Sequence, residues 1–172
     1  MKKQENKKLK ILIITPSCNE EYFLPNLIQS VISQSLLPDE WVIVDDGSTD
    51  DTANIIKEAS LKYPWIRYIR NEKNEKRSPG SSVINAFYKG FNNRKMNSFD
   101  VVCKLDADLS LPKDYLEKIN SKMINNTDIG ICGGVCTVNG KIEGLTNLDH
   151  VRGAIKAYRE KCFNEIGGLV HY

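Results

Sequence analysis

The sequence predicts an α/β fold with a mostly parallel central sheet that helices cover on both faces. Short runs of β-branched and aliphatic residues alternate with segments whose apolar residues recur every three or four positions. This alternation is typical of buried parallel strands that are each followed by an amphipathic helix. Acidic residues also follow two of the apolar runs directly, at Asp45-Asp46 and at Asp106. Ligands of open parallel sheets bind outside the carboxyl ends of the strands, so these acids mark a candidate site.

The first part of the chain contains three predicted strand-helix units. The strands are Leu9 to Thr15, which stops at Pro16, Trp41 to Val44, and Ile66 to Ile69. The helices run from Tyr22 to about Leu37-Pro38, from Ser48 to Tyr63-Pro64, and from Val83 to about Asn93. Asn19 and Glu20 suit the capped start of the first helix, and Ser48 with Asp51 resembles a capping box at the start of the second.

The second part of the chain predicts further strands and helices. A buried strand at Val101 to Leu105 is followed by a helix from Leu111-Pro112, and Ile129 to Val138 has the composition of another strand, whose glycines suggest a bulge or a close approach. A short strand at Ala154 to Tyr158 and a helix from Arg159 to Ile166 end the pattern at Gly167-Gly168.

Length and composition limit the possible classes of protein. The 172 residues suit one domain, which we assign to 9–172, after a disordered basic leader at 1–8 that has no apolar signal region. A net charge of +2 gives no reason to expect a nucleic-acid partner, and no apolar run approaches the roughly 18 residues of a membrane span. The odd number of cysteines, 5, favours reduced thiols and a cytoplasmic location, and Cys132 and Cys136 lack the further ligands of a zinc site.

Asp106 and Asp108 form a D-x-D pattern at the end of the Val101 to Leu105 strand. On an extended backbone, residues two apart point the same way, so both carboxylates could hold one divalent cation and, through it, a phosphate. A solvated start of a loop is the alternative for this pair, as helix capping is for Asn19 and Glu20. The polar segment from Arg70 to Ser82 carries basic residues that are often only solvated, although such a loop can close over phosphates.

Four motifs together resemble one known family. They are TPSCNEE at 15–21, VIVDDGSTDDT at 42–52, KLDADLSLP at 104–112 and RGAIKAYREKCFNEIGGL at 152–169. In this order and spacing the chain resembles family 2 glycosyltransferases of the GT-A fold, from about Leu9 onward. The resemblance implies a three-layer α/β/α, Rossmann-like domain that transfers a sugar, with inversion, from a nucleotide-diphosphate donor to an acceptor hydroxyl. The donor is often UDP-linked in this family, and Mg²⁺ or Mn²⁺ binds at the D-x-D pattern.

The same resemblance assigns site residues. Thr15, Pro16, Asn19 and Glu20 would line the nucleotide pocket, Asp46 with Asp45 nearby would accept from the base, Asp106 would meet the ribose or the metal, Asp108 would be the direct metal ligand, and Lys76 or Arg77 would contact the nucleotide. The acceptor would be a carbohydrate or lipid-linked. The family's general base lies after the IGG segment, so we expect it beyond Tyr172, in a longer and possibly membrane-associated protein of which this chain binds donor but transfers poorly.

Three other classes are weighed against this one. A nucleotidyltransferase would carry a glycine-rich basic loop after the first strand, where this chain has PSCNEE, and a dinucleotide-binding domain would carry G-x-G-x-x-G there. A non-catalytic module that binds nucleotide-sugar stays open, although the intact Asp46, Asp106 and Asp108 argue against it.

Overall fold

The computed structural model describes residues 8–71, 81–138, 140–142 and 151–169, and strands and helices alternate from β1 to α4 as predicted. The strands are β1 (Ile11–Ser17), β2 (Glu40–Asp45), β3 (Ile66–Arg70), β4 (Val101–Leu105), β5 (Ile131–Cys132), β6 (Thr137–Val138), β7 (Lys141–Ile142) and β8 (Ile155–Arg159). The helices are α1 (Leu24–Ile32), α2 (Thr52–Lys62), α3 (Ser81–Asn92), α4 (Tyr115–Asn125) and α5 (Glu160–Glu165).

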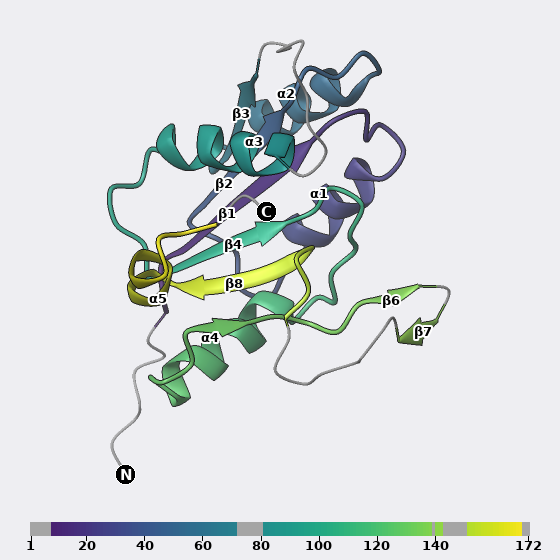
Figure 1. Ribbon diagram of the computed structural model, residues 1–172. Coiled ribbons are helices and arrows are strands. Elements are labelled where there is room, and N and C mark those ends of the chain that lie inside the picture. The colour runs from purple at the N-terminus through teal and green to yellow at the C-terminus, as the bar shows by residue number, and fades with distance from the viewer. Residues whose placement is uncertain (1–7, 72–80, 139, 143–150, 170–172) are drawn as a thin grey trace.

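Six strands form one sheet in the order β3-β2-β1-β4-β8-β5, and β6 pairs only with β7, at a distance from the sheet (Figure 1). β1 pairs in parallel with β2 and β4, and β2 pairs in parallel with β3. β8 runs antiparallel to β4 and β5, so the sheet is mixed at this end. The carboxyl ends of β1, β2 and β4 therefore lie together at one edge of the sheet.

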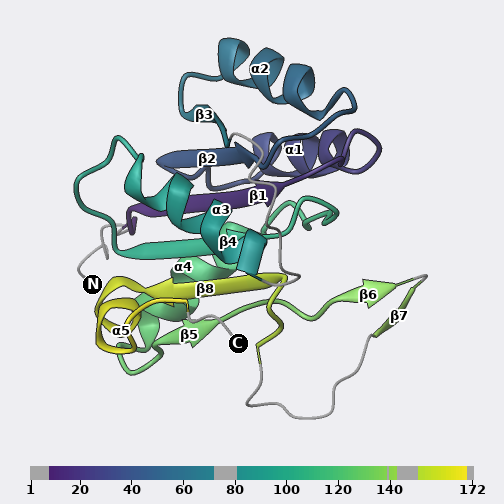
Figure 2. The same ribbon diagram turned by 45° about the horizontal axis from the view of Figure 1, so that its top comes forward.

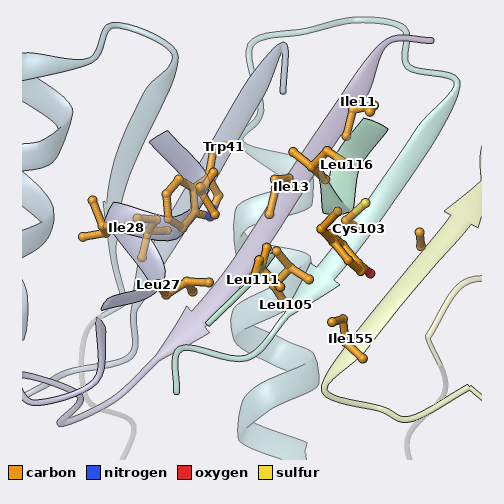
Figure 3. Close-up of a cluster of buried hydrophobic side chains, with 14 of the residues drawn as sticks. Ile11, Ile13, Leu27, Ile28, Trp41, Cys103, Leu105, Leu111, Leu116 and Ile155 are labelled. Carbon is orange, nitrogen blue, oxygen red and sulfur yellow. The ribbon is translucent and has the colours of Figure 1, made fainter. Parts of the chain in front are cut away.

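Helices cover both faces of the sheet, which gives three layers (Figure 2). On one face, Ile11 and Ile13 belong to a large apolar cluster with residues of α1, α2 and α4, part of which Figure 3 shows. On the other face, Leu12 and Ile14 belong to a second cluster with α3 and α5. The alternation of side chains along a strand produces this division, and it confirms the predicted α/β/α arrangement.

Strand β1 continues through Pro16, where the sequence predicts its end. Pro16 pairs with Val44 of β2, whereas the pairing of β1 with β4 stops at Ile14 and Lys104. The missing N–H of Pro16 therefore costs no hydrogen bond on the β4 side, and proline is tolerated there.

Helix α1 buries the predicted stripe of Leu24, Leu27, Ile28 and Val31, but it ends at Ile32 and not near Leu37-Pro38. The chain leaves the helix because Gln34 binds residues just before and within the first turn of α4. Its side-chain amide donates to Pro112 O at 2.7 Å, and its Oε1 accepts the N–H of Leu116 at 2.9 Å. Tertiary contacts thus override the helical pattern of the sequence.

Two predicted capping interactions are absent. The N-cap residues are Phe23 for α1 and Asp51 for α2, and neither makes a side-chain capping hydrogen bond. Helix α4 also begins later than predicted, at Tyr115. The polar residues expected to cap α1 and α2 contact one another across two loops instead, as described below.

The predicted strand from Ile129 to Val138 is interrupted. Only Ile131–Cys132 joins the main sheet, and Thr137–Val138 pairs with β7. A Cβ atom at Gly133 would lie 2.3 Å from the carbonyl oxygen of Ile155, so only glycine fits where the chain passes β8. The expected close approach at these glycines is confirmed.

Two contacts fix the first described residues to the domain. Lys8 forms an ion pair with Asp39 at 3.1 Å, and the N–H of Leu9 donates to Asn120 at 2.9 Å. No disulfide joins any of the five cysteines. Within the described residues, no helix has the length and apolar character needed to cross a membrane.

Candidate active site

A cavity of about 310 Å³ lies at the carboxyl ends of β1, β2 and β4, on the face of the sheet that α3 covers. The first cluster of buried residues fills the opposite face, and Ala107 is the residue that this cluster shares with the cavity wall. Its lining residues are Pro16, Ser17, Cys18, Glu20, Asp46, Ser82, Val83, Ala86, Lys104, Asp106, Ala107 and Asp108. The structure thus brings together Pro16, Glu20, Asp46, Asp106 and Asp108, five of the residues that the sequence predicts for the site.

The loop after β1 is fixed to the loop after β2 by reciprocal hydrogen bonds. Asn19 has a positive φ of 58°, and its Oδ1 accepts the N–H of Thr49 at 2.8 Å. The backbone N–H of Asn19 donates to Ser48 Oγ at 3.0 Å, and that of Glu20 donates to Thr52 Oγ1 at 2.8 Å. These contacts hold Glu20 at the cavity wall, while Asn19 itself lies outside the lining.

Asp45 and Asp46 have different surroundings although they are adjacent. Asp45 is 0% exposed, and its carboxylate accepts the N–H of Ser48 at 2.8 Å and an N–H of Arg70 at 2.8 Å. Asp46 is partly exposed and lines the cavity, with its backbone N–H on Ser17 O at 2.8 Å. Asp45 therefore fixes the turn after β2, and Asp46 is the member of the pair that a ligand can reach.

Thr15 lies on the face of the sheet away from the cavity. It is 0% exposed, and its Oγ1 accepts the indole N–H of Trp41 at 2.9 Å. Ile11 and Ile13, which share its parity in β1, belong to the cluster on the face of α1, α2 and α4. Thr15 and Asp45 thus support the site from behind, and the predicted Lys76 and Arg77 lie outside the described residues.

Lys104 is a cavity residue that the sequence analysis does not single out. It lies in β4, only 9% exposed, and its ammonium group forms an ion pair with Asp106. The sequence signal for this pair was a lysine within an apolar strand, two residues before an aspartate. Residues two apart on a strand share a face, so the two side chains can meet. Asp106 is also fixed through its backbone N–H, which donates to Ala154 O at 2.9 Å.

Asp106 and Asp108 lie in the turn after β4 and not on an extended strand. The negative charges of both nevertheless affect the pKa of Glu20. Partial burial, followed by the negative charges of Asp108, Asp106 and Asp50, raises the pKa of Glu20 above its ordinary value of 4.5. The cavity therefore has a negative potential that favours a cation.

The carboxylate oxygens of the cavity suit a divalent cation that is also coordinated by a bound phosphate compound. Within the described ranges, no group of three or more His, Cys, Asp and Glu side chains is arranged to hold a metal ion by itself. Mg²⁺ is commonly held by one or two carboxylates together with substrate phosphates and water. Asp106 and Asp108 could supply the carboxylates of such a set.

A family model for "Glycosyl transferase family 2" matches residues 12–171, which include the sheet apart from Ile11 and every residue of the cavity wall. The chain belongs to glycosyl transferase family 2. Two curated relatives, both glycosyltransferases by name, agree with this assignment. This family 2 chain is 32% identical over 158 residues to glycosyltransferase GlyA of Streptococcus pneumoniae, covering 91% of the chain and 20% of the relative. It is 36% identical over 137 residues to dolichol-phosphate mannosyltransferase of Pyrococcus furiosus, covering 78% of the chain and 36% of the relative.

Solved structures show that the fold of this family 2 chain is the predicted GT-A fold. TarS 1-349 of S. aureus, in complex with UDP, superposes with a TM-score of 0.73 at 20% identity over 92% of the chain and 49% of TarS. The mannosyltransferase PcManGT of Pyrobaculum calidifontis, in complex with GDP-Man and Mn²⁺, superposes with a TM-score of 0.68 at 19% identity. The match covers 95% of the chain and 48% of PcManGT. The chain spans about half of these structures, and less of the two curated relatives.

Proposed function

We propose that the cavity binds the nucleoside diphosphate of a nucleotide-sugar donor, and that the protein transfers the sugar to an acceptor hydroxyl with inversion. The observation that carries this proposal is the convergence of Glu20, Asp46, Lys104, Asp106 and Asp108 on one cavity at the carboxyl ends of three parallel strands. In open α/β sheets this edge is where ligands bind. Family membership supports the transfer of a glycosyl group.

The base and ribose of the donor fit the part of the cavity near β2. Asp46 is the accessible acid there, and it can accept an N–H of the base, while Pro16 provides an apolar wall. Asp45 acts indirectly, because it holds the backbone of Ser48 and so fixes the turn that presents Asp46. UDP is the proposed nucleotide, since the TarS structure was solved with UDP, and GDP is the competitor, since PcManGT was solved with GDP-Man.

The diphosphate would lie beside the acids after β4, with Asp108 as the direct ligand of Mg²⁺ or Mn²⁺ and Asp106 on the metal or the ribose. When bound, the metal neutralises the diphosphate that leaves. The chain's own residues hold the donor between β2, β4 and α3, with Ser82, Val83 and Ala86 closing the α3 side. An acceptor hydroxyl then attacks the opposite face of the anomeric carbon and needs a general base within hydrogen-bond reach.

The acceptor class is proposed from the names of relatives. The names of two relatives include dolichol phosphate and undecaprenyl phosphate, and another relative is a chondroitin synthase. We therefore propose a carbohydrate or lipid-linked acceptor.

Calorimetric titration of UDP and GDP, each with and without Mn²⁺, tests the donor site. We expect UDP to bind with Mn²⁺ in the micromolar range, which corresponds to about 8 kcal/mol, and we expect Asp108→Asn to lose this binding. Asp128→Asn is the matched control, because Asp128 is exposed and lies outside the cavity wall. If neither nucleotide binds the folded chain, or if Asp108→Asn binds as well as the control, the proposed donor site is wrong.

A further inference from the structure

Lys104 is a buried cation in the middle of the sheet. Its side chain is 11% exposed, and it lies on the same face as Val102, which belongs to the cluster under α3. Burying an ammonium group is costly unless an anion pairs with it. Asp106, two residues further along the chain, provides that anion.

Lys104 alone is basic among the described residues that line the cavity, whereas Glu20, Asp46, Asp106 and Asp108 are all acidic. Lys156 of β8 stands directly opposite Lys104 in the antiparallel register but is not part of the cavity wall. Lys104 is therefore the one cationic side chain of the described lining that can form an ion pair with a phosphate. In the structure it is already paired with Asp106.

A divalent cation bound at Asp106 would compete with Lys104 for its carboxylate. A metal bound without nucleotide would displace the ammonium group and leave it buried and unpaired. A nucleoside diphosphate without metal would bring negative charge beside four acids, which is also unfavourable. If the two bound together, Asp106 would hold the metal and Lys104 would pair with a phosphate oxygen, so both residues would keep a partner of opposite charge.

We propose that Lys104 is an internal counter-ion of the metal site, which couples the binding of the divalent cation to the binding of the nucleoside diphosphate. The proposal rests on the donor site proposed above. In the absence of ligand, Lys104 neutralises Asp106. On binding, Lys104 passes from Asp106 to a phosphate of the donor, and no covalent bond changes.

Electron paramagnetic resonance of free Mn²⁺ measures the coupling directly. The folded chain, Lys104→Met and Lys156→Met are titrated with Mn²⁺, with and without saturating UDP. In the unaltered chain we expect UDP to tighten Mn²⁺ binding about tenfold or more, as for an ordinary coupling free energy. Lys104→Met should bind Mn²⁺ alone more tightly than the unaltered chain and should lose most of the effect of UDP, whereas Lys156→Met should behave like the unaltered chain.

The outcomes separate this inference from the donor site itself. If the unaltered chain binds Mn²⁺ and UDP but Lys104→Met keeps the full coupling, the role of Lys104 is refuted and the donor site stands. If the unaltered chain binds neither, both fail. Should Lys104→Met not fold, ¹⁵N resonances of the lysine ammonium groups in the unaltered chain replace it: the Lys104 signal should shift with Mg²⁺ and UDP together, and an equal shift with Mg²⁺ alone would refute the coupling.

Discussion

The side chain of Asn19 accepts the backbone N–H of Thr49 at 2.8 Å, while the backbone of Asn19 lies in the left-handed region at a φ of 58°. One residue thus joins the loop after β1 to the loop after β2. Asparagine suits both tasks, because it tolerates positive φ better than most residues and carries an amide oxygen. This junction places Glu20 and Asp46 on the same cavity.

Substitutions at Asn19 separate its two tasks. Asn19→Gly keeps the backbone conformation and loses the hydrogen bond, so we expect a loss of about 1 kcal/mol in the free energy of unfolding. Asn19→Ala adds the strain of a left-handed alanine, about 1 kcal/mol more. Urea denaturation measures both, and equal losses for the two variants would show that the positive φ contributes nothing.

Asp45 is expected to matter for stability more than its partner Arg70. Asp45→Ala removes a fully buried carboxylate that accepts from Ser48 and Arg70, and we expect a loss of about 3 kcal/mol. Arg70→Met should cost less, because the side chain of Arg70 is 49% exposed and water can replace it. Thermal unfolding of both variants provides the comparison, and a larger loss for Arg70→Met would contradict this assignment.

Gly90 allows α3 to approach the sheet. A Cβ at this position would lie 2.8 Å from Val44 Cγ2 and 3.0 Å from Ile14 Cγ2. Gly90→Ala should therefore lower the free energy of unfolding by about 1–2 kcal/mol, despite the better helix propensity of alanine. It should also weaken UDP binding, because α3 supplies Val83 and Ala86 to the cavity.

Gly153→Ala is the control for Gly90→Ala, since nothing lies within 4 Å of a Cβ there and its φ is not positive. We expect its stability to stay within about 0.5 kcal/mol of the unaltered chain. Equal effects of the two substitutions would exclude close packing as the cause.

The raised pKa of Glu20 predicts a pH dependence of stability. The folded chain holds this proton more tightly than the unfolded chain, so the penalty is absent below the ordinary pKa of 4.5 and complete above the raised pKa. Glu20→Gln should be more stable than the unaltered chain at neutral pH, and the difference should shrink as the pH falls toward 4.5.

Urea denaturation of both proteins across this pH range measures the difference. Comparing the two proteins removes the contribution of Asp114, whose lowered pKa acts in the opposite direction and which is present in both. A difference that grows on acidification would contradict the raised pKa of Glu20.

The sequence predicted those features that depend on local pattern. Continuous apolar runs located β2 and β4, because these strands are buried along their whole length. The stripe from Leu24 to Val31 located α1, because the spacing of apolar residues shows which face of a helix is buried. The direction of β8 could not be predicted in this way, since a strand pattern does not specify its partner's orientation. The end of α1 depends on contacts of Gln34 with residues about 80 positions away, which spacing does not encode.

The same limit applies to the site. Strand ends followed by acids correctly located the cavity, and Asp46, Asp106 and Asp108 lie in its wall. Parity along β1 could have excluded Thr15 from the cavity face, once the opposite face was known to carry the larger core. The burial of Asp45 depends on three-dimensional contacts and became visible only in the structure, whereas the pairing of Lys104 with Asp106 joins residues two apart in the sequence.

The most direct measurement is paramagnetic broadening of backbone amide signals by Mn²⁺ in the presence of UDP. We expect selective loss of the signals of Asp46, Ala86 and Ala107 at the cavity, with those of Ser121 and Asn125 on α4 retained, because α4 covers the opposite face of the sheet. This pattern should disappear in Asp108→Asn. Broadening centred on α4, or a pattern that Asp108→Asn leaves unchanged, would contradict a metal-dependent nucleotide site at the ends of β1, β2 and β4.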